Sequence, residues 1–340
     1  MLRIFHNPNY NFIRWWRWAA GLTIAFIAIG LATYAMTPPN YSIEFTGGTL
    51  MQLRFQQAPN VAEIRSTLDH AGVRGAEIQQ FGTGTEYTVR AQGAANVAEQ
   101  AAGAGAVSTR IQSALRGKYG NAFTVVRTEA VGPRVGEELK RGAMIALLLG
   151  SLATLAYLAF RFEWRFGVAA VLSSVHDVLV TAAFIKLFHI EVSLTVVAAI
   201  LTLLGYSMND TIIIFDRVRE NLKKQRREPL YDTLNRSINE TLPRSVLTHA
   251  TTFAAALALM LFAGEVIRPF AVVMAFGVVV GVFSSVYVAS PLLLWVEQKW
   301  PRRTTDKAGI SASRARAAST ADARPARPAA ARREEAPVSR

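Results

Sequence analysis

Six long apolar segments dominate the pattern of the chain. They cover residues 19–36, 142–160, 167–188, 192–215, 245–264 and 270–296. A helix needs about 20 apolar residues to cross the hydrocarbon core of a bilayer, and each segment comes close to this length. The sequence therefore predicts a polytopic α-helical membrane protein with six transmembrane helices. The first segment is longer than the apolar part of an ordinary signal peptide, so we expect an uncleaved anchor.

Residues 37–136, between the first and second spans, follow a different pattern and predict a soluble domain. Its expected elements are a strand at 51–55, a helix at 60–72, strands at 76–81 and 85–90 around a Gly-Thr-Gly turn, a helix from about residue 96, and a strand at 123–130. Apolar and polar residues alternate in the first strand, and Asn60 with a glutamate three residues later is an N-terminal capping signal. This order predicts a ferredoxin-like α+β domain.

Charge predicts the orientation of the spans. The segment 216–244 is expected to form a loop between the fourth and fifth spans, and it carries eight Lys and Arg residues. Loops rich in Lys and Arg stay in the cytoplasm, whereas long domains cross the membrane whatever their charge. This loop, which belongs to a five-helix bundle at 137–298, is therefore expected on the cytoplasmic side of the membrane. Both termini, 1–18 and 299–340, are then cytoplasmic, and the soluble domain is extracytoplasmic, in the periplasm.

The composition limits the classes of function. The net charge is +13, but the basic residues lie beside apolar segments and in the last forty residues. They are explained by membrane orientation and a disordered basic tail, so we expect no specific nucleic acid as a partner. The chain has no cysteine, which excludes disulfides and thiolate metal sites. No nucleophile elbow, phosphate loop or metal-ligand set is present, and we expect neither an enzyme nor a cofactor.

Two carboxylates fall inside predicted spans. Asp177, preceded by His176, lies near the middle of the third span, and Asp210 lies in the fourth, towards the basic segment. An ionised carboxylate at the centre of a span costs about 2.5–3.5 kcal/mol on insertion scales, so such residues usually serve a function. A buried acid can bind and release a proton. Asp210 and Asp177 are therefore candidates for a proton relay.

Further polar residues accompany Asp210 on the fourth span. Four of them recur every seven residues and so share one helix face, namely Thr195, Thr202, Asn209 and Asp216. Tyr206 stands about one turn before Asp210. Hydrogen bonds between helices would explain the threonines without a function, but they explain an aspartate poorly. Asp216 lies at the membrane boundary, where a salt bridge is its ordinary role.

The fifth span begins with a cation, Arg244. A cation that approaches or leaves a buried carboxylate changes its proton affinity, so Arg244 is a candidate for the group that controls Asp210. It is equally well explained as a boundary charge. His249, Thr251 and Thr252 either extend a polar path or hold helices together. In the last span, Gly277 and Gly281 favour close helix contact.

Several segments resemble one family. GYSMNDTIIIFDRVREN at 205–221 resembles the fourth-span signature of the SecF family of export subunits. Similar blocks are FTGGT at 45–49, VGPRVGEEL at 131–139, the His176-Asp177 pair and TLPRSVLTHATT at 241–252. The resemblance covers about residues 10–298. The chain departs from the family pattern at Glu44, where Asp is usual, and at Pro243 and His249, where Ser is usual.

The resemblance implies half of a transporter of the resistance-nodulation-division type in the bacterial inner membrane. The implied partners are SecD, the SecYEG channel, other inner-membrane translocase subunits and the exported unfolded polypeptide. The implied function is to use the proton-motive force in late steps of protein export. Asp210 would be the proton-binding carboxylate, and Arg244 would be the cation that modulates Asp210. Asp177 would be a supporting residue. The outer domain would move or contact the emerging polypeptide.

Two other interpretations stay open on the residues alone. A proton-coupled transporter of small solutes or lipids from the same superfamily would use a membrane carboxylate equally well. It predicts a second six-span half or a homo-oligomer, with a ligand cavity in the outer domain. A structural scaffold, whose charges only set its topology, predicts that Asp210→Asn has no effect.

Overall fold

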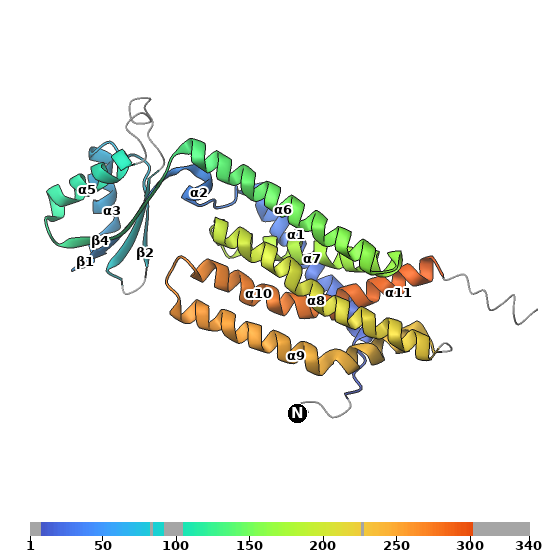
Figure 1. Ribbon diagram of the computed structural model, residues 1–340. Helices are drawn as coiled ribbons and strands as arrows, with labels where there is room; N and C mark the ends of the chain where they lie inside the picture. The colour runs from blue at the N-terminus through green and yellow to red at the C-terminus, as the bar shows by residue number, and fades with distance from the viewer. Residues whose placement is uncertain (1–7, 82–83, 92–104, 226–227, 302–340) are drawn as a thin grey trace, which may run out of the picture. The chain divides into compact units, whose positions relative to one another are not determined.

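The computed structural model describes residues 8–81, 84–91, 105–225 and 228–301. Within these ranges, six helical segments are long and apolar enough to cross a membrane, which confirms the six predicted spans (Figure 1). They are α1 (Trp16–Met36), α6 (Pro133–Arg161), α7 (Trp164–Leu187), α8 (Leu194–Lys224), α9 (Leu230–Phe262) and α10 (Arg268–Ser284). The last continues through a π-helical turn, η2 (Ser285–Ala289), into α11 (Ser290–Lys299).

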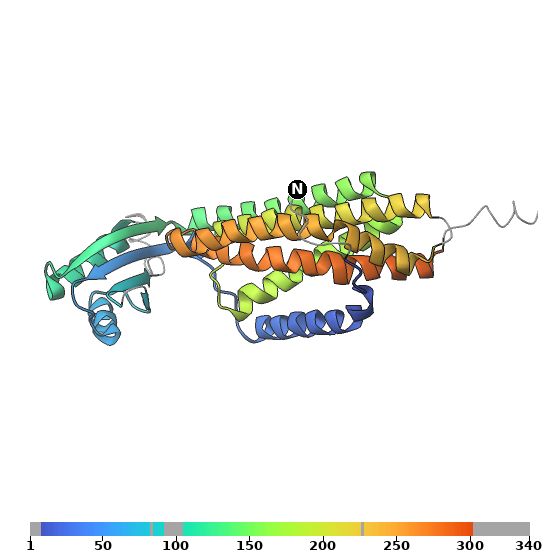
Figure 2. The ribbon, with the colours of Figure 1, turned by 90° about the horizontal axis from the view of Figure 1, so that it is seen from below.

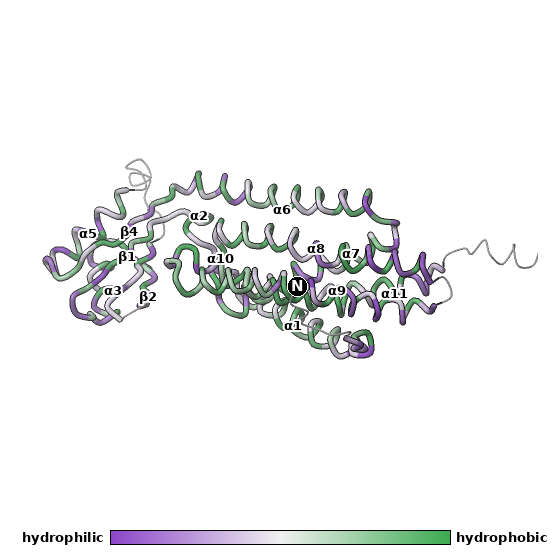
Figure 3. Tube along the Cα trace, turned by 60° about the horizontal axis from the view of Figure 1, so that its bottom comes forward, coloured by the Kyte–Doolittle hydropathy of each residue, from purple (hydrophilic) through white to green (hydrophobic). Residues whose placement is uncertain are grey.

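Several helices extend beyond their apolar segments. Most of the segment 216–244 is helical and does not form the predicted loop, since only residues 225–229 connect α8 to α9. Ion pairs one turn apart support this extension, because Glu220 pairs with Arg217 at 2.6 Å and with Lys224 at 2.7 Å. The hydrophilic residues gather at the helix ends (Figure 3). We call the end formed by 216–224 and 230–244 the basic end.

Helix α8 is central to the bundle, because it contacts α6, α7, α9 and α10. Its contact with α10 is close. A Cβ atom on Gly277 would lie 2.2 Å from Leu203 Cδ1, and one on Gly281 would lie 3.3 Å from Ser207 Cβ. This confirms the predicted role of the two glycines. Helix α1, blue in Figure 2, contacts α7.

The soluble domain has the predicted ferredoxin-like order of elements. It consists of β1 (Gly48–Phe55), α3 (Val61–His70), β2 (Glu77–Phe81), β3 (Glu86–Ala91), α5 (Gly105–Tyr119) and β4 (Phe123–Val131). The strands form one antiparallel sheet in the order β2-β3-β1-β4. The Asn60 side chain caps α3 by accepting from Ala62 N at 2.8 Å. The predicted start of the second helix, near residue 96, lies outside the described residues.

Apolar side chains from β1, α3 and α5 fill the core of this domain. Leu53, Ile64 and Ile111 are fully buried there. The alternation along β1 has the expected cause, because Met51, Leu53 and Phe55 enter this core while the residues between them face away. This core holds the sheet and its two helices together.

A short helix that the sequence did not predict, α2 (Ile43–Thr46), joins α1 to the sheet. Gly47 follows it with a φ of 71°, and a Cβ atom there would lie 2.9 Å from Pro133 Cα. Only glycine fits such a position without strain. The Glu44 carboxylate accepts a hydrogen bond from Leu194 N at 2.6 Å, so α2 caps the first turn of α8.

Candidate functional site

Asp210 lies between α8 and α9 and is 2% exposed. The Ser245 hydroxyl on α9 donates a hydrogen bond to its Oδ1 atom. Its Oδ2 atom is buried and has no hydrogen-bond partner among the described residues. One carboxyl oxygen is therefore held by Ser245, and the other is buried without a partner among the described residues.

The polar residues of α9 next to Asp210 form one connected group. The Tyr206 hydroxyl on α8 donates to the Thr248 carbonyl at 2.9 Å and lies 2.9 Å from Thr252 Oγ1. The His249 ring packs edge-on against Tyr206, with ring centroids 5.2 Å apart. Thr251 instead bonds back to Thr248 within α9. Tyr206 therefore joins the predicted site from α8, whereas Thr251 does not.

A cavity of about 500 Å³ opens at the basic end beside this group. Its lining residues are Ile213, Asp216, Arg217, Glu220, Glu240, Thr241 and Arg244. We call it the basic-end cavity. Asp216 pairs with Arg161 at 2.6 Å and Glu240 pairs with Arg217 at 2.6 Å, so these carboxylates are neutralised locally. Ile213 and Arg244, which line this cavity, lie on the turn after Asp210 and next to Ser245, respectively.

Arg244 differs from the other charges of the basic-end cavity. It is exposed and forms no ion pair within the part of the chain that the structure describes. It stands next to Ser245 in the chain, and its charge acts on Asp210 without direct contact. Arg244 therefore adjoins the residue that bonds Asp210. Its control of Asp210 stays a prediction.

Asp177 forms a second polar centre, between α7, α8 and α10. It is 8% exposed. Its Oδ2 accepts hydrogen bonds from Ser207 and, at 2.9 Å, from Ser284, and its Oδ1 lies 3.0 Å from His176 Nδ1. Ser284 immediately precedes the π-helical turn η2. Both oxygens of Asp177 therefore have partners, unlike those of Asp210.

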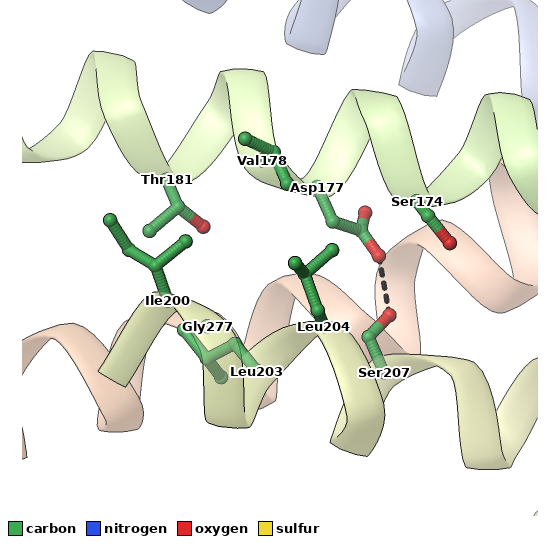
Figure 4. Close-up of a pocket in the computed structure, with 9 residues that line it drawn as sticks. All are labelled: Ser174, Asp177, Val178, Thr181, Ile200, Leu203, Leu204, Ser207 and Gly277. Carbon is green, nitrogen blue, oxygen red and sulfur yellow. Dashed lines mark hydrogen bonds between the residues drawn. The ribbon is translucent and has the colours of Figure 1, made fainter. Parts of the chain in front are cut away.

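A small cavity adjoins Asp177, as Figure 4 shows. Its volume of about 10 Å³ is close to the room that one water molecule needs, and Ser174, Thr181 and Ser207 supply polar atoms nearby. The two acids lie on different sides of α8, since Ser207 contacts Asp177 while Asp210, almost one turn later, contacts α9. No direct bond joins the two centres among the described residues.

Two other predicted residues lie away from both centres. Asn209 is exposed, as is Thr202 seven residues earlier, so part of the predicted polar stripe faces outward from α8. Asp216 lies at the basic end, where it is held by Arg161 and Arg219. Sequence reasoning missed Ser245 as the partner of Asp210. Its only signal was its place directly after Arg244.

Comparison with known proteins decides the family. Residues 111–299 match the family model of the protein export membrane protein SecD/SecF, C-terminal, and residues 35–59 match the SecD/SecF GG motif. The SecF protein translocase subunit of Gemmatimonas aurantiaca is 65% identical over 327 residues, which cover 95% of this chain and 98% of that protein. The chain belongs to the SecF family of protein translocase subunits. With its six apolar helices, it is a multi-pass inner-membrane protein.

More distant relatives agree with the family. SecF of Escherichia coli O157:H7 is 35% identical over 290 residues, covering 85% of this chain and 88% of that protein. The crystal structure of SecDF from Thermus thermophilus, a translocon-associated membrane protein, superposes with a TM-score of 0.75 at 37% identity. The match covers 86% of this chain but only 39% of the SecDF chain. The family favours an export subunit over a transporter of solutes or lipids.

Proposed function

We propose that this SecF-family chain couples proton movement to late steps of protein export, as an accessory subunit that works with SecD and the Sec translocase. A solved SecDF chain is more than twice as long as the part that this chain matches. A separate SecD would supply the other half. The SecYEG channel, other translocase subunits and the exported polypeptide would be the further partners.

The observation that carries this proposal is the buried Asp210 carboxyl with one unpartnered oxygen. It is held by Ser245, and the preceding residue, the cation Arg244, lines the basic-end cavity. A proton binds at Oδ2, and the approach of Arg244 favours its release, because a cation stabilises the ionised carboxylate. Release occurs through the basic-end cavity towards the cytoplasm. In this orientation both termini are cytoplasmic and the sheet domain faces the periplasm.

The outward face of α8 supports a partner within the membrane. Thr202, Gly205 and Asn209 are exposed in the isolated chain, although they lie inside an apolar helix. Small and polar residues are typical of contacts between transmembrane helices. SecD is the partner we expect to cover this face, which gives Asn209 a role in assembly.

The outer domain would transmit the conformational change that proton binding drives in the bundle to the exported polypeptide. Helix α8 carries Asp210 near its basic end, and Glu44 caps its opposite end from the short helix that leads into β1. A shift of α8 would therefore reach the sheet domain directly. In this proposal the domain moves against, or contacts, the polypeptide emerging from the channel.

The test is gradient-dependent release of an exported protein into inside-out membrane vesicles. Asp210→Asn is compared with wild type at equal levels of assembled complex, with and without a protonophore. We expect release to lose its dependence on the gradient in this variant. Asp232→Asn is the matched control, because it removes an exposed carboxylate of the basic end that does not line the basic-end cavity. Normal gradient dependence in Asp210→Asn would refute the proposal.

A further inference from the structure

We propose that the His249 imidazole is a second proton acceptor in the Asp210 site, which makes the site a carboxyl–imidazole pair. The inference rests on the proposed function of Asp210 and adds a second group to it. His249 lies on α9, one turn after Ser245, and is 7% exposed. Nothing in the coupling scheme above uses this buried titratable side chain.

The hydrogen bond of His249 fixes which ring nitrogen is free. Its Nδ1 atom lies 2.8 Å from the Ser245 carbonyl oxygen. A carbonyl oxygen only accepts, so Nδ1 is the donor, and in the neutral ring Nε2 carries the lone pair. Nε2 is buried and has no hydrogen-bond partner among the described residues. The neutral imidazole therefore presents an open acceptor atom inside the bundle.

Ser245 connects this ring to the carboxyl group. Its carbonyl holds His249 Nδ1, and its hydroxyl donates to Asp210 Oδ1. One residue thus orients both titratable groups, and each keeps one buried, open atom, Oδ2 on Asp210 and Nε2 on His249. In a pair held by one residue, protonation of one group changes the proton affinity of the other.

A purely structural role explains this arrangement poorly. Buried polar atoms in proteins are nearly all hydrogen-bonded, and a histidine that only joins helices would use both of its nitrogens. The ring is instead fixed by one nitrogen and by the edge of Tyr206. The Tyr206 hydroxyl is directed to Thr248, so it does not satisfy Nε2. The second nitrogen remains available for a proton.

Few other charges compete with this pair. Helix α8 contributes Asp210 and Tyr206, and α9 itself contributes Arg244. Of the other segments packed against α9, α10 with η2 has no titratable side chain between Arg268 and Tyr287, and residues 13–15 contribute Arg14, which is exposed. Asp210 is therefore the carboxyl partner of His249. Arg244 is the cation of this site.

The first experiment measures the titration of His249 without any transport assay. Deuterium exchange at the imidazole C2 position, followed residue by residue by mass spectrometry, gives a midpoint for each histidine of the purified complex. We expect the pH dependence of exchange at His249 to differ between wild type and Asp210→Asn, because Ser245 bonds both groups in one site. The exposed His70, in the soluble domain, should keep its midpoint.

The outcomes separate this inference from the proposed function. If exchange at His249 did not depend on pH in the wild-type complex, the pair would be overturned, even if Asp210→Asn abolishes coupling. Conversely, the exchange at His249 could depend on pH while Asp210→Asn keeps normal gradient-dependent release. That result would refute the proposed function of Asp210. The wild-type titration decides the first point even where a variant fails to assemble.

A second variant tests the consequence for export. His249→Asn can keep a donor to the Ser245 carbonyl but does not titrate near neutral pH. Release of the exported protein by this variant should remain gradient-dependent. The plot of release rate against pH should lose the step that protonation of the imidazole contributes. An unchanged pH profile in this variant would contradict the pair.

Discussion

The Ser245 hydroxyl on α9 donates a hydrogen bond to Asp210 Oδ1 on α8, across the interface of the two helices. A change in the charge of Asp210 therefore acts directly on the contact between α8 and α9. From Asp210 to Leu194, where Glu44 caps the helix, α8 runs about 24 Å at 1.5 Å per residue. One continuous helix thus joins the Asp210 carboxyl to the short helix α2, which leads into the sheet domain.

Arg244 should control how readily Asp210 releases its proton. Arg244→Ala removes the unpaired cation of the basic-end cavity, and we expect gradient-dependent release to slow by about tenfold, the effect of about 1.4 kcal/mol on a barrier. Arg244→Lys keeps the charge and should retain most of the rate. Lys223→Ala, which removes another cation of the basic end, is the control. Equal rates for Arg244→Ala and wild type would rule out this role.

Asp177 should contribute more to stability than Asp210 does. Asp177→Ala leaves the hydroxyls of Ser207 and Ser284 without their buried acceptor, which costs about 1–3 kcal/mol. We expect a lower midpoint of thermal unfolding for the complex in detergent. Asp177→Asn keeps an acceptor oxygen and should lose less. A midpoint equal to wild type in Asp177→Ala would show that these bonds contribute nothing.

Gly30 should be required for the packing of α1 on α7. A Cβ atom there would lie 2.3 Å from Ala183 Cβ and 2.7 Å from its Cα, so the helices must separate in Gly30→Ala. Overpacking of this kind costs about 1–3 kcal/mol. Gly21→Ala is the control on the same helix, because no atom lies within 4 Å of its Cβ position. Equal thermal stability of the two variants would contradict the close contact.

The ion pair between Arg90 of β3 and Glu191, in the turn before α8, should hold the sheet against that turn. Arg90→Glu breaks it, and exposed pairs are worth up to about 1 kcal/mol. Amide exchange at Val192, which donates to the Asn40 carbonyl at 2.7 Å, should then speed up severalfold. Combining Arg90→Glu with Glu191→Arg restores opposite charges and should slow the exchange again. No difference between the single and double variants would mean that the pair has no such role.

Local patterns predicted much of the fold from the sequence. The spans follow from apolar length, and the order of strands and helices in the domain follows from alternation and from the Asn60 cap. Gly277 and Gly281 likewise indicated their close contact. Helix α8 nevertheless extends to Lys224, because its ion pairs continue the helix after the apolar segment ends. Hydropathy alone does not register that contribution.

The partners of the two acids were not predictable in the same way. Ser245 and Ser284 meet Asp210 and Asp177 only because of how the helices rotate and pack. A heptad count placed Asn209 on the same polar face as Asp216, but it does not tell whether that face points inward or outward. The π-helical turn after Ser284 has no clear sequence signal either. Such contacts depend on residues far apart in the chain.

The most direct test of the central claim is the protonation of Asp210 itself. Infrared difference spectra of the purified complex in lipid, recorded as the pH is changed, report the carbonyl stretch of protonated carboxylic acids. We predict a band that appears with protonation in wild type, disappears in Asp210→Asn and persists in Asp177→Asn. A band that is unchanged in Asp210→Asn would show that another group binds the proton.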